Sequence, residues 1–334
     1  MTKRIWIAVF LIFVTQCFWP SRTDAQAGPN CTWTVNVWSW LAAPPGTYGC
    51  IIVGVEGGDP CFLQTPLCWP SAAPSENCPC ANHAGGKPVS LATGDTWIEE
   101  TDVNLPGLGG GLQLRRTWNS MWPSTQAAYQ IGPFGPNWSS SYIERIFVGA
   151  DHYIKYQRAN GSFWSFGYTN GYWIPAAPAN AVATLVYGTT TWTLTFQDGA
   201  QRIFSIATGS LLSIVDRNGN TTNLSYDTLN RLTTVTDPAS RHLYFNYGPS
   251  SFLIQSVTSD FGVTVSYSYD SLGRLNQVTE PDGSTLAFQF DSNSYITTVL
   301  DSQNKVLEAH TYDSNGRALS YSNANGAESF TISY

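Results

Sequence analysis

The residue types that most often do chemistry are present in this chain, but they are not spaced for it. The four histidines occur in no H-E-x-x-H or other metal-ligand spacing, and no G-x-S-x-G elbow marks a nucleophilic serine. The glycine-rich run over 107–111 lacks the G-K-[ST] of a phosphate-binding loop. We therefore expect no catalytic residue, cofactor or metal. The histidines are His83, His152, His242 and His310.

Three aspartates stand out because they recur, each directly after a tyrosine. Asp227, Asp270 and Asp313 are spaced 43 residues apart. An active site is normally single, whereas an aspartate repeated with its surroundings is typical of a turn, where its carboxylate accepts backbone hydrogen bonds. We interpret the three carboxylates as turn-forming and not as catalytic.

Six cysteines remain after the N-terminal segment, and they lie close together in the sequence. In an exported chain an even, clustered set indicates disulfides, for which three bridges allow 15 connectivities. A zinc site built from Cys78, Cys80 and His83 with Cys61 or Cys68 is the alternative, although its spacing lacks a pair of C-x-x-C motifs. The disulfide candidates are Cys31, Cys50, Cys61, Cys68, Cys78 and Cys80.

Residues 1–27 have the layout of a secretory signal peptide. Two basic residues precede an apolar run over 5–18, and an Ala-Gln-Ala triplet predicts cleavage after Ala27. A lipoprotein anchor at Cys17 is the other reading, disfavoured by the large Gln16 before it. No later run reaches the ~20 apolar residues of a membrane helix. We expect an exported protein, secreted or at the cell surface, without a membrane span after cleavage.

Composition indicates the fold class and limits the partners. The net charge is −7, which argues against a nucleic-acid partner, because phosphate binding needs clustered Lys and Arg. Only 12% of the residues are charged, whereas 14% are aromatic. Strands favour aromatic and β-branched residues, and surface helices need Glu, Lys and Arg. The composition predicts an all-β protein.

Aromatic residues recur through the C-terminal part at a nearly constant interval. Their spacings are 22, 21, 22, 21, 22 and 22 residues, and a tyrosine–aspartate pair returns every 43. A period of this size is typical of a small supersecondary unit that is copied and stacked. The aromatics are Phe204, Tyr226, Tyr247, Tyr269, Phe290, Tyr312 and Tyr334.

Each unit is predicted to be a β-hairpin with two turns. Gly273 follows Asp270 and, like Asn230 in the equivalent place, can take a positive φ. Leu275 and Val278 are three residues apart, which a regular strand would place on opposite faces, and a β-bulge is one explanation. The recurring arginines could form ion pairs along the stack. The predicted repeat-motif residues are Tyr226, Asp227, Arg231, Tyr269, Asp270, Gly273, Arg274, Tyr312, Asp313, Gly316 and Arg317.

The chain is divided by changes in composition and pattern. Residues 28–84 are rich in Cys, Pro and Gly and form a loop-rich N-terminal segment. Residues 85–203 are a β-rich opening domain of short alternating strands. Residues 204–334 carry the repeats, which we expect to stack edge to edge into one continuous curved sheet, because a lone hairpin is marginal in water.

The units resemble the YD repeats of the Rhs family, whose pattern is Y-D-x-x-G-R-L-x-x-V-x-x-P-x-G. The stretch Tyr269–Gly283 carries the pattern best, and Tyr226–Pro238 follows closely. The unit at Tyr312 has Ala318 in place of leucine.

A second resemblance lies upstream, to the uncharacterised domain that opens Rhs cores. The two signatures occur in the order of the family and together cover residues 85–334. The upstream signature lies in residues 86–95, 100–103, 114–120 and 132–138.

The resemblance implies a shell of YD units, a partial Rhs shell in this chain, that encloses or displays a C-terminal payload. In polymorphic toxins of the family the payload is a toxic domain released by self-cleavage, and in related surface proteins the repeats are linked to carbohydrate binding. This chain has about six units, no self-cleavage segment and no payload, and it stops at Tyr334, the first residue of a further unit. We expect the N-terminal part of a longer protein or the product of a truncated gene, with a downstream Rhs core or effector segment as partner.

A stand-alone extracellular binder of carbohydrate or of a neighbouring cell surface is the alternative function. Tryptophans in the opening domain could contribute flat aromatic faces to such a surface, or they could fill the interior of the sheet stack. No single one can be nominated from the sequence. They are Trp118, Trp122, Trp138, Trp164 and Trp173.

Overall fold

A computed structural model describes residues 89–90, 93–122, 130–149, 153–169, 172–178, 180–248, 251–323, 326 and 328–334. The signal peptide, the six cysteines, His83 and His152 lie outside the described residues. Within the described part, no helix is long and apolar enough to cross a membrane.

The opening elements are short and mostly paired with one another. β1, β2 and β5 form a three-stranded antiparallel sheet, and β3 pairs with β4. These elements are β1 (Trp97–Leu105), a 3-10 turn η3 (Leu108–Gly110), β2 (Leu112–Asn119), β3 (Ile131–Gly132), β4 (Gly135–Pro136) and β5 (Trp138–Ser140).

One large antiparallel sheet follows, in which each strand pairs with the next along the chain, as stacked hairpins require. Its strands are β6 (Arg145–Val148), β7 (Ile154–Gln157), β8 (Phe163–Thr169), β9 (Tyr172–Ala177), β10 (Ala183–Tyr187), β11 (Thr191–Phe196), β12 (Gln201–Ser205), β13 (Leu211–Val215), β14 (Thr221–Tyr226), β15 (Leu232–Thr236), β16 (His242–Tyr247), β17 (Ile254–Ser259), β18 (Thr264–Tyr269), β19 (Leu275–Thr279), β20 (Thr285–Phe290), β21 (Ile296–Leu300), β22 (Val306–Tyr312), β23 (Ala318–Asn323) and β24 (Ser329–Thr331).

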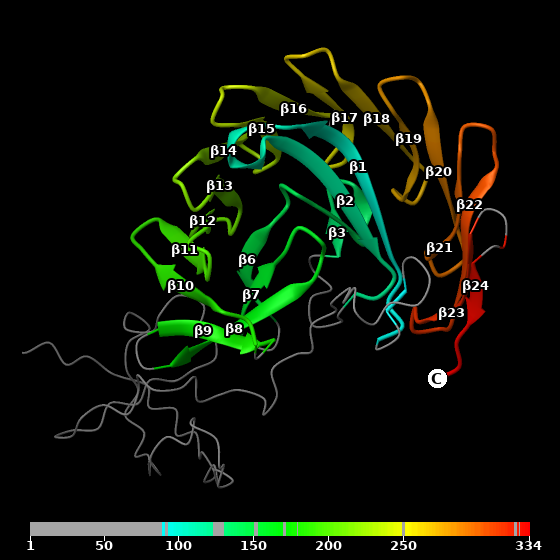
Figure 1. The fold of residues 1–334 in the computed structure, drawn as a ribbon, viewed down its shortest axis with the longest axis horizontal. Coiled ribbons are helices and arrows are strands. Elements are labelled where there is room, and N and C mark those ends of the chain that lie inside the picture. The colour runs from blue at the N-terminus through cyan, green and yellow to red at the C-terminus, as the bar shows by residue number, and fades with distance from the viewer. Residues whose placement is uncertain are drawn as a thin grey trace, which may run out of the picture.

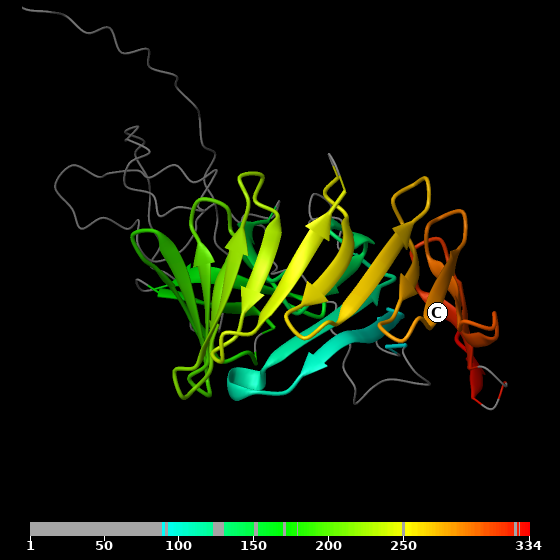
Figure 2. The same cartoon turned by 90° about the horizontal axis from the view of Figure 1, so that it is seen from above.

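The sheet is strongly curved and wraps around the opening strands. Figure 1 shows β10 to β24 as an arc with β1 and β2 on its inner side, and Figure 2 shows the hairpin turns gathered along two rims. At its first end the sheet closes on itself, because a bridge joins Arg145 to Ser210 and the Ile146 amide donates to the Gly209 carbonyl at 2.9 Å. The predicted all-β fold of stacked hairpins in a curved sheet is confirmed.

Every repeat contains a β-bulge opposite its aromatic residue. Tyr269 pairs with Leu275 while Ser268 pairs with Gln277, so one residue is left over on the second strand. The bulge turns Leu275 and Val278 to the same side, and both are fully buried. The suspected bulge is thus confirmed. The same shift occurs at Phe204, Tyr226, Tyr247, Phe290 and Tyr312.

Tyrosine hydroxyls fasten one repeat to the one before it. The Tyr226 hydroxyl donates to the Leu211 carbonyl at 2.6 Å, and that of Tyr269 donates to the Ile254 carbonyl at 2.7 Å. Tyr312 repeats the bond at 2.8 Å. Each acceptor is the first residue of the preceding bulge, where a carbonyl is displaced from the regular ladder. The aromatic period therefore corresponds to a repeated structural contact between neighbours.

Candidate functional site

The repeat sheet presents a column of inward-facing side chains that packs against the described residues between 93 and 147, which we call the opening segment. Phe245 meets Tyr142 at a ring-centroid distance of 6.3 Å, and Phe288 meets Trp138 at 5.4 Å. Both pairs lie edge to face, the arrangement that aromatic quadrupoles favour. All four residues are buried. The concave face of the sheet is therefore filled by side chains of the opening segment.

A fully buried ion pair lies in the middle of this contact. Arg116 on β2 donates from Nε and Nη2 to the two carboxylate oxygens of Asp102 on β1, at 2.5 and 2.7 Å. Tyr267 of the repeat sheet donates its hydroxyl to the same carboxylate at 2.6 Å. The guanidinium also stacks on Trp138 at 4.7 Å. One polar centre thus joins the opening strands to the repeats.

The charged and polar groups of this centre shift one another's pKa values. Burial alone would lower the pKa of Arg116, but the charge and hydrogen bonds of Asp102 outweigh burial and raise it. Burial, and then the Asp102 charge, raises the pKa of Tyr267 well above its ordinary value. Arg116 therefore stays charged and Tyr267 stays a hydroxyl donor at any physiological pH.

Two further carboxyl groups beside the pair are only weakly acidic. Burial raises the pKa of Glu100 from 4.5 to about 7; the Arg116 charge lowers it and the Asp102 charge raises it. The pKa of Glu280 is likewise raised to about 7, first by burial and then by the Asp102 charge. Near neutral pH, the interior contact is therefore sensitive to protonation.

A second polar contact joins the opening segment to the first repeat strands. Arg202 on β12 donates from Nε to both oxygens of Glu144 at 3.2 Å, and Tyr156 on β7 donates its hydroxyl to that carboxylate. Burial and the Glu144 charge raise the pKa of Tyr156 well above its ordinary value. Arg202 occupies the column place that Phe245 and Phe288 occupy in later repeats, so the same place makes an ionic contact in an early repeat and aromatic contacts in later ones.

The opening segment also follows one rim of the sheet, in reverse order to the repeats. The Ser120 hydroxyl donates to the Gly316 carbonyl at 2.7 Å, and the Ile254 amide donates to the Pro133 carbonyl at 2.8 Å. Together with the contact between 146 and 209, these bonds fix the segment along most of the rim. On the other rim Arg241 donates to the Pro106 carbonyl at 3.0 Å.

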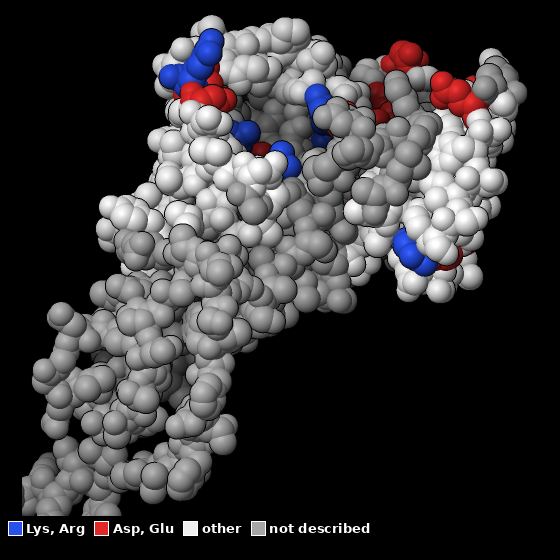
Figure 3. All heavy atoms as spheres, turned by 60° about the horizontal axis from the view of Figure 1, so that its bottom comes forward, with Lys and Arg blue, Asp and Glu red and all other residues white. Residues whose placement is uncertain are grey.

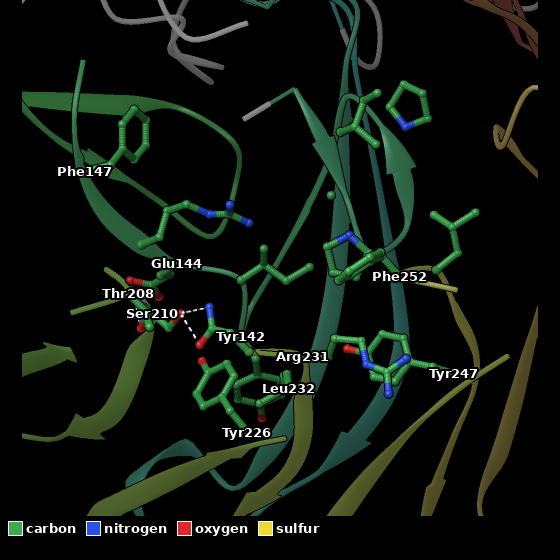
Figure 4. Close-up of a pocket in the computed structure, with 18 of the residues that line it drawn as sticks. Tyr142, Glu144, Phe147, Thr208, Ser210, Tyr226, Arg231, Leu232, Tyr247 and Phe252 are labelled. Atoms are coloured by element: carbon green, nitrogen blue, oxygen red, sulfur yellow. Dashed lines mark hydrogen bonds between the residues drawn. The ribbon is translucent and has the colours of Figure 1, made fainter. Parts of the chain in front are cut away.

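A groove opens where the opening segment and the rim separate. Its volume is about 540 Å³, and Figure 4 shows Tyr226, Arg231, Leu232 and Tyr247 on its repeat side. Segments 131–136 and 142–147 form the opposite wall.

The sequence-predicted motif residues lie together in turns along this rim. Asp270 accepts from the Leu272 and Arg274 amides at 2.9 Å and from Arg274 Nε at 2.6 Å. Burial alone would raise the pKa of Asp270, but these hydrogen bonds outweigh it and lower the pKa. Asp227 with Arg231 and Asp313 with Arg317 repeat the arrangement. Asn230, Gly273 and Gly316 have φ of 58°, 74° and 79°.

The motif arginines connect successive repeats by stacking. Within a turn each pairs with its own aspartate, so the ion pairs are local and do not form a ladder between repeats. Each guanidinium lies instead over the next aromatic of the column. The distances to the ring centroid are 4.8 Å from Arg231 to Tyr247, 4.6 Å from Arg274 to Phe290 and 4.4 Å from Arg317 to Tyr334.

The two described histidines lie far apart on different faces. His242 is partly exposed and its Nδ1 lies 2.7 Å from Asp260, whereas His310 is buried beside Tyr312 and Tyr321. Among the described residues, no three His, Cys, Asp or Glu side chains group as metal ligands. On the face drawn in Figure 3, coloured basic side chains lie in small groups with acidic ones nearby.

Sequence reasoning missed the interior contact. Asp102 and Arg116 were noted only as part of a family signature, and Tyr267 not at all. No periodic signal marks them, because the contact joins residues 165 positions apart. Of the tryptophans considered for a binding surface, Trp118, Trp138 and Trp173 are buried.

Two family models match the chain. A domain of unknown function, DUF6531, matches residues 86–166, and the teneurin YD-shell matches residues 189–300. No curated protein matches the chain.

Several solved structures align with the chain at low identity. A crystal structure of TcdB2-TccC3 is 14% identical over 68% of this chain and 16% of that chain, with a TM-score of 0.30. The Photorhabdus luminescens Tc holotoxin pore is 12% identical over 68% and 14%, with a TM-score of 0.25. The chain thus spans less than a fifth of the length of either.

Proposed function

Because this chain belongs to the Rhs/YD-repeat family, we propose that it is a non-enzymatic structural module. In this proposal the chain as a whole is the first part of a shell that encloses or displays a C-terminal effector. The observation that supports the proposal most strongly is the position of β1 and β2 inside the curved repeat sheet (Figure 1). Side chains of described residues between 97 and 147, on these strands and just after them, line the inner face of the wall, from Glu144 against Arg202 at one end to Trp138 against Phe288 further along.

The interior side chains of this contact serve packing and cohesion. Arg116, Asp102 and Tyr267 bind one another, and the aromatic rings fill the remaining space. Arg116 Nη1 has no hydrogen-bond partner among the described residues, but the guanidinium lies over the Trp138 ring. A buried centre whose charged groups are bound to each other stabilises a wall and offers little to a substrate. This supports a structural role over a catalytic one.

The wall continues, in our proposal, through a strand added to β24. β24 pairs with β23 along one edge. An exposed strand edge, such as the opposite edge of β24, accepts a further strand by backbone hydrogen bonding. Arg317 stacks on Tyr334 as Arg274 stacks on Phe290, so residue 334 already occupies the place of a repeat aromatic. The added strand would belong to a downstream Rhs segment.

Export belongs to the same proposal. A signal peptide over 1–27, cleaved after Ala27, would place the shell outside the cell, where disulfides among the six cysteines form. N-terminal sequencing of the protein recovered from the medium tests this, with Gly28 as the expected first residue.

Protease protection tests the function. The chain is produced with the coding sequence that follows residue 334 in its own genome, ending in an epitope tag, and the same downstream polypeptide alone is the control. We expect the tag in the extended chain to survive protease concentrations that destroy the control. Equal digestion would contradict enclosure. A locus without repeat-coding sequence after residue 334 would favour the stand-alone binder, which a glycan array then tests.

A further inference from the structure

One repeat turn on the rim is not joined to the opening segment in the way its neighbours are. Backbone contacts reach Gly209 and Ile254, on either side of the turn at Asp227–Arg231. Among the described residues, no backbone–backbone hydrogen bond joins the opening segment to that turn. The groove of about 540 Å³ occupies this position, between the backbone contacts at Gly209 and at Ile254.

Large apolar side chains surround the mouth of the groove. Ile131 is 70% exposed, Phe252 64% and Leu272 69%, and all three line it. Apolar side chains that are gathered in a concave surface and exposed to this extent are typical of an interaction site. The guanidinium of Arg231 lies on the repeat side (Figure 4), where it is paired with Asp227 and donates to the Ser251 carbonyl. The groove therefore suits an occupant with bulky apolar side chains.

Residues 28–84 of this chain have that chemistry. The segment carries few charges, with three acidic residues and no Lys or Arg. Tryptophan is the side chain that gains most from burial in a groove of this kind. The segment contains Trp33, Trp38, Trp40 and Trp69.

The segment is also long enough to reach the groove. It leads to Val89, which packs against Ala318 and Tyr321 at the last repeats. From β23 to β15 the distance along the sheet is about 38 Å at about 4.8 Å per strand. The twenty residues from Trp69 to Val89 span about 66 Å when extended, at about 3.3 Å per residue.

We propose that a tryptophan-bearing stretch of residues 28–84 docks in the groove at the Asp227–Arg231 turn and completes the interface along the rim. Its apolar side chains cover Ile131, Phe252 and Leu272. The continuity of the groove with the existing intrachain interface favours this occupant over a second copy or a separate protein.

Photo-crosslinking within the full mature chain tests the proposal. p-Benzoylphenylalanine is placed at Leu272, and at Tyr244 on the outer face as the control. We expect the probe at 272 to give a monomeric product whose crosslinked peptide, identified by mass spectrometry, comes from residues 28–84. The probe at 244 should give little of that product.

A matched variant separates docking from chance proximity. With the probe at Phe252, we expect Leu272→Asp to lower the yield of the 28–84 crosslink severalfold, while far-UV circular dichroism stays unchanged. A crosslinked dimer whose yield rises with concentration would overturn the proposal in favour of a second copy. A yield at 272 no higher than at 244 would overturn it as well, and so would capture of another protein in place of residues 28–84.

Discussion

Tyr267 of the repeat sheet and Asp102 of the opening segment share a 2.6 Å hydrogen bond across 165 residues of sequence. The same carboxylate holds Arg116 through two further bonds, and all three side chains are buried. A buried carboxylate with these donors is costly to disturb, because a partner left behind remains buried and unpaired. The opening segment and the repeats are therefore parts of one folded unit.

The repeat-to-repeat tyrosine bond is expected to contribute measurably to stability. Tyr269→Phe removes the hydroxyl that donates to the Ile254 carbonyl, and we expect a loss of about 1 kcal/mol in the free energy of unfolding. Tyr172→Phe is the control, because Tyr172 is 67% exposed and its hydroxyl can bond to water in the folded and the unfolded state alike. Its removal should be neutral. Urea unfolding of the two variants measures the difference, and equal losses would contradict the assignment.

At Gly135 the backbone of the opening segment lies so close to a repeat turn that a larger residue is expected to destabilise the fold. Gly135 has φ of 92°, and a Cβ there would lie 2.7 Å from the Gly273 carbonyl oxygen. We expect Gly135→Ala to destabilise by about 1–3 kcal/mol more than Gly283→Ala.

Gly283 is a suitable control because its φ of 85° is similar and no atom lies within 4 Å of the added Cβ. The backbone strain is therefore shared by both variants, and only the clash differs. Thermal unfolding of both proteins decides the matter. A Gly135→Ala protein as stable as Gly283→Ala would mean that the opening segment does not rest on this turn.

The fold of the repeats was largely predictable, for a reason visible in single residues. Six of the seven aromatics of the 21- to 22-residue period, from Phe204 to Tyr312, lie opposite a bulge, which is one explanation that the spacing of Leu275 and Val278 allowed. Turn chemistry is local, so Asp270 and Gly273 could be placed from sequence.

The interior contact could not be predicted in the same way. Asp102, Arg116 and Tyr267 meet only because the sheet curves, and curvature arises from the sum of many small twists and bulges. The groove was equally hidden, since it is formed by the separation of two segments more than 60 residues apart in sequence.

The free energy of unfolding is expected to fall as pH rises from about 4.5 toward neutrality. The folded-state pKa of Glu100 is raised from 4.5 to about 7, chiefly by burial, so the folded state binds this proton more tightly than the unfolded state does. The resulting stabilisation is complete below about pH 4.5 and is lost as pH rises through about 7. Glu100→Gln should flatten the slope between about pH 4.5 and about pH 7. Urea titrations at several pH values measure it, and an unchanged slope would contradict the assignment.

The central claim is that β1 and β2 pack against the inner face of the repeat sheet and unfold together with it. Hydrogen exchange of Tyr267→Phe tests this claim most directly. Removing one hydroxyl from β18 should lower the stability of the joint unit by about 1–2 kcal/mol, which corresponds to roughly 5- to 30-fold faster exchange. We predict this increase in peptides that cover β1 as well as in peptides that cover β18, because both report the same opening event. Faster exchange confined to β18, with β1 unchanged, would contradict the claim.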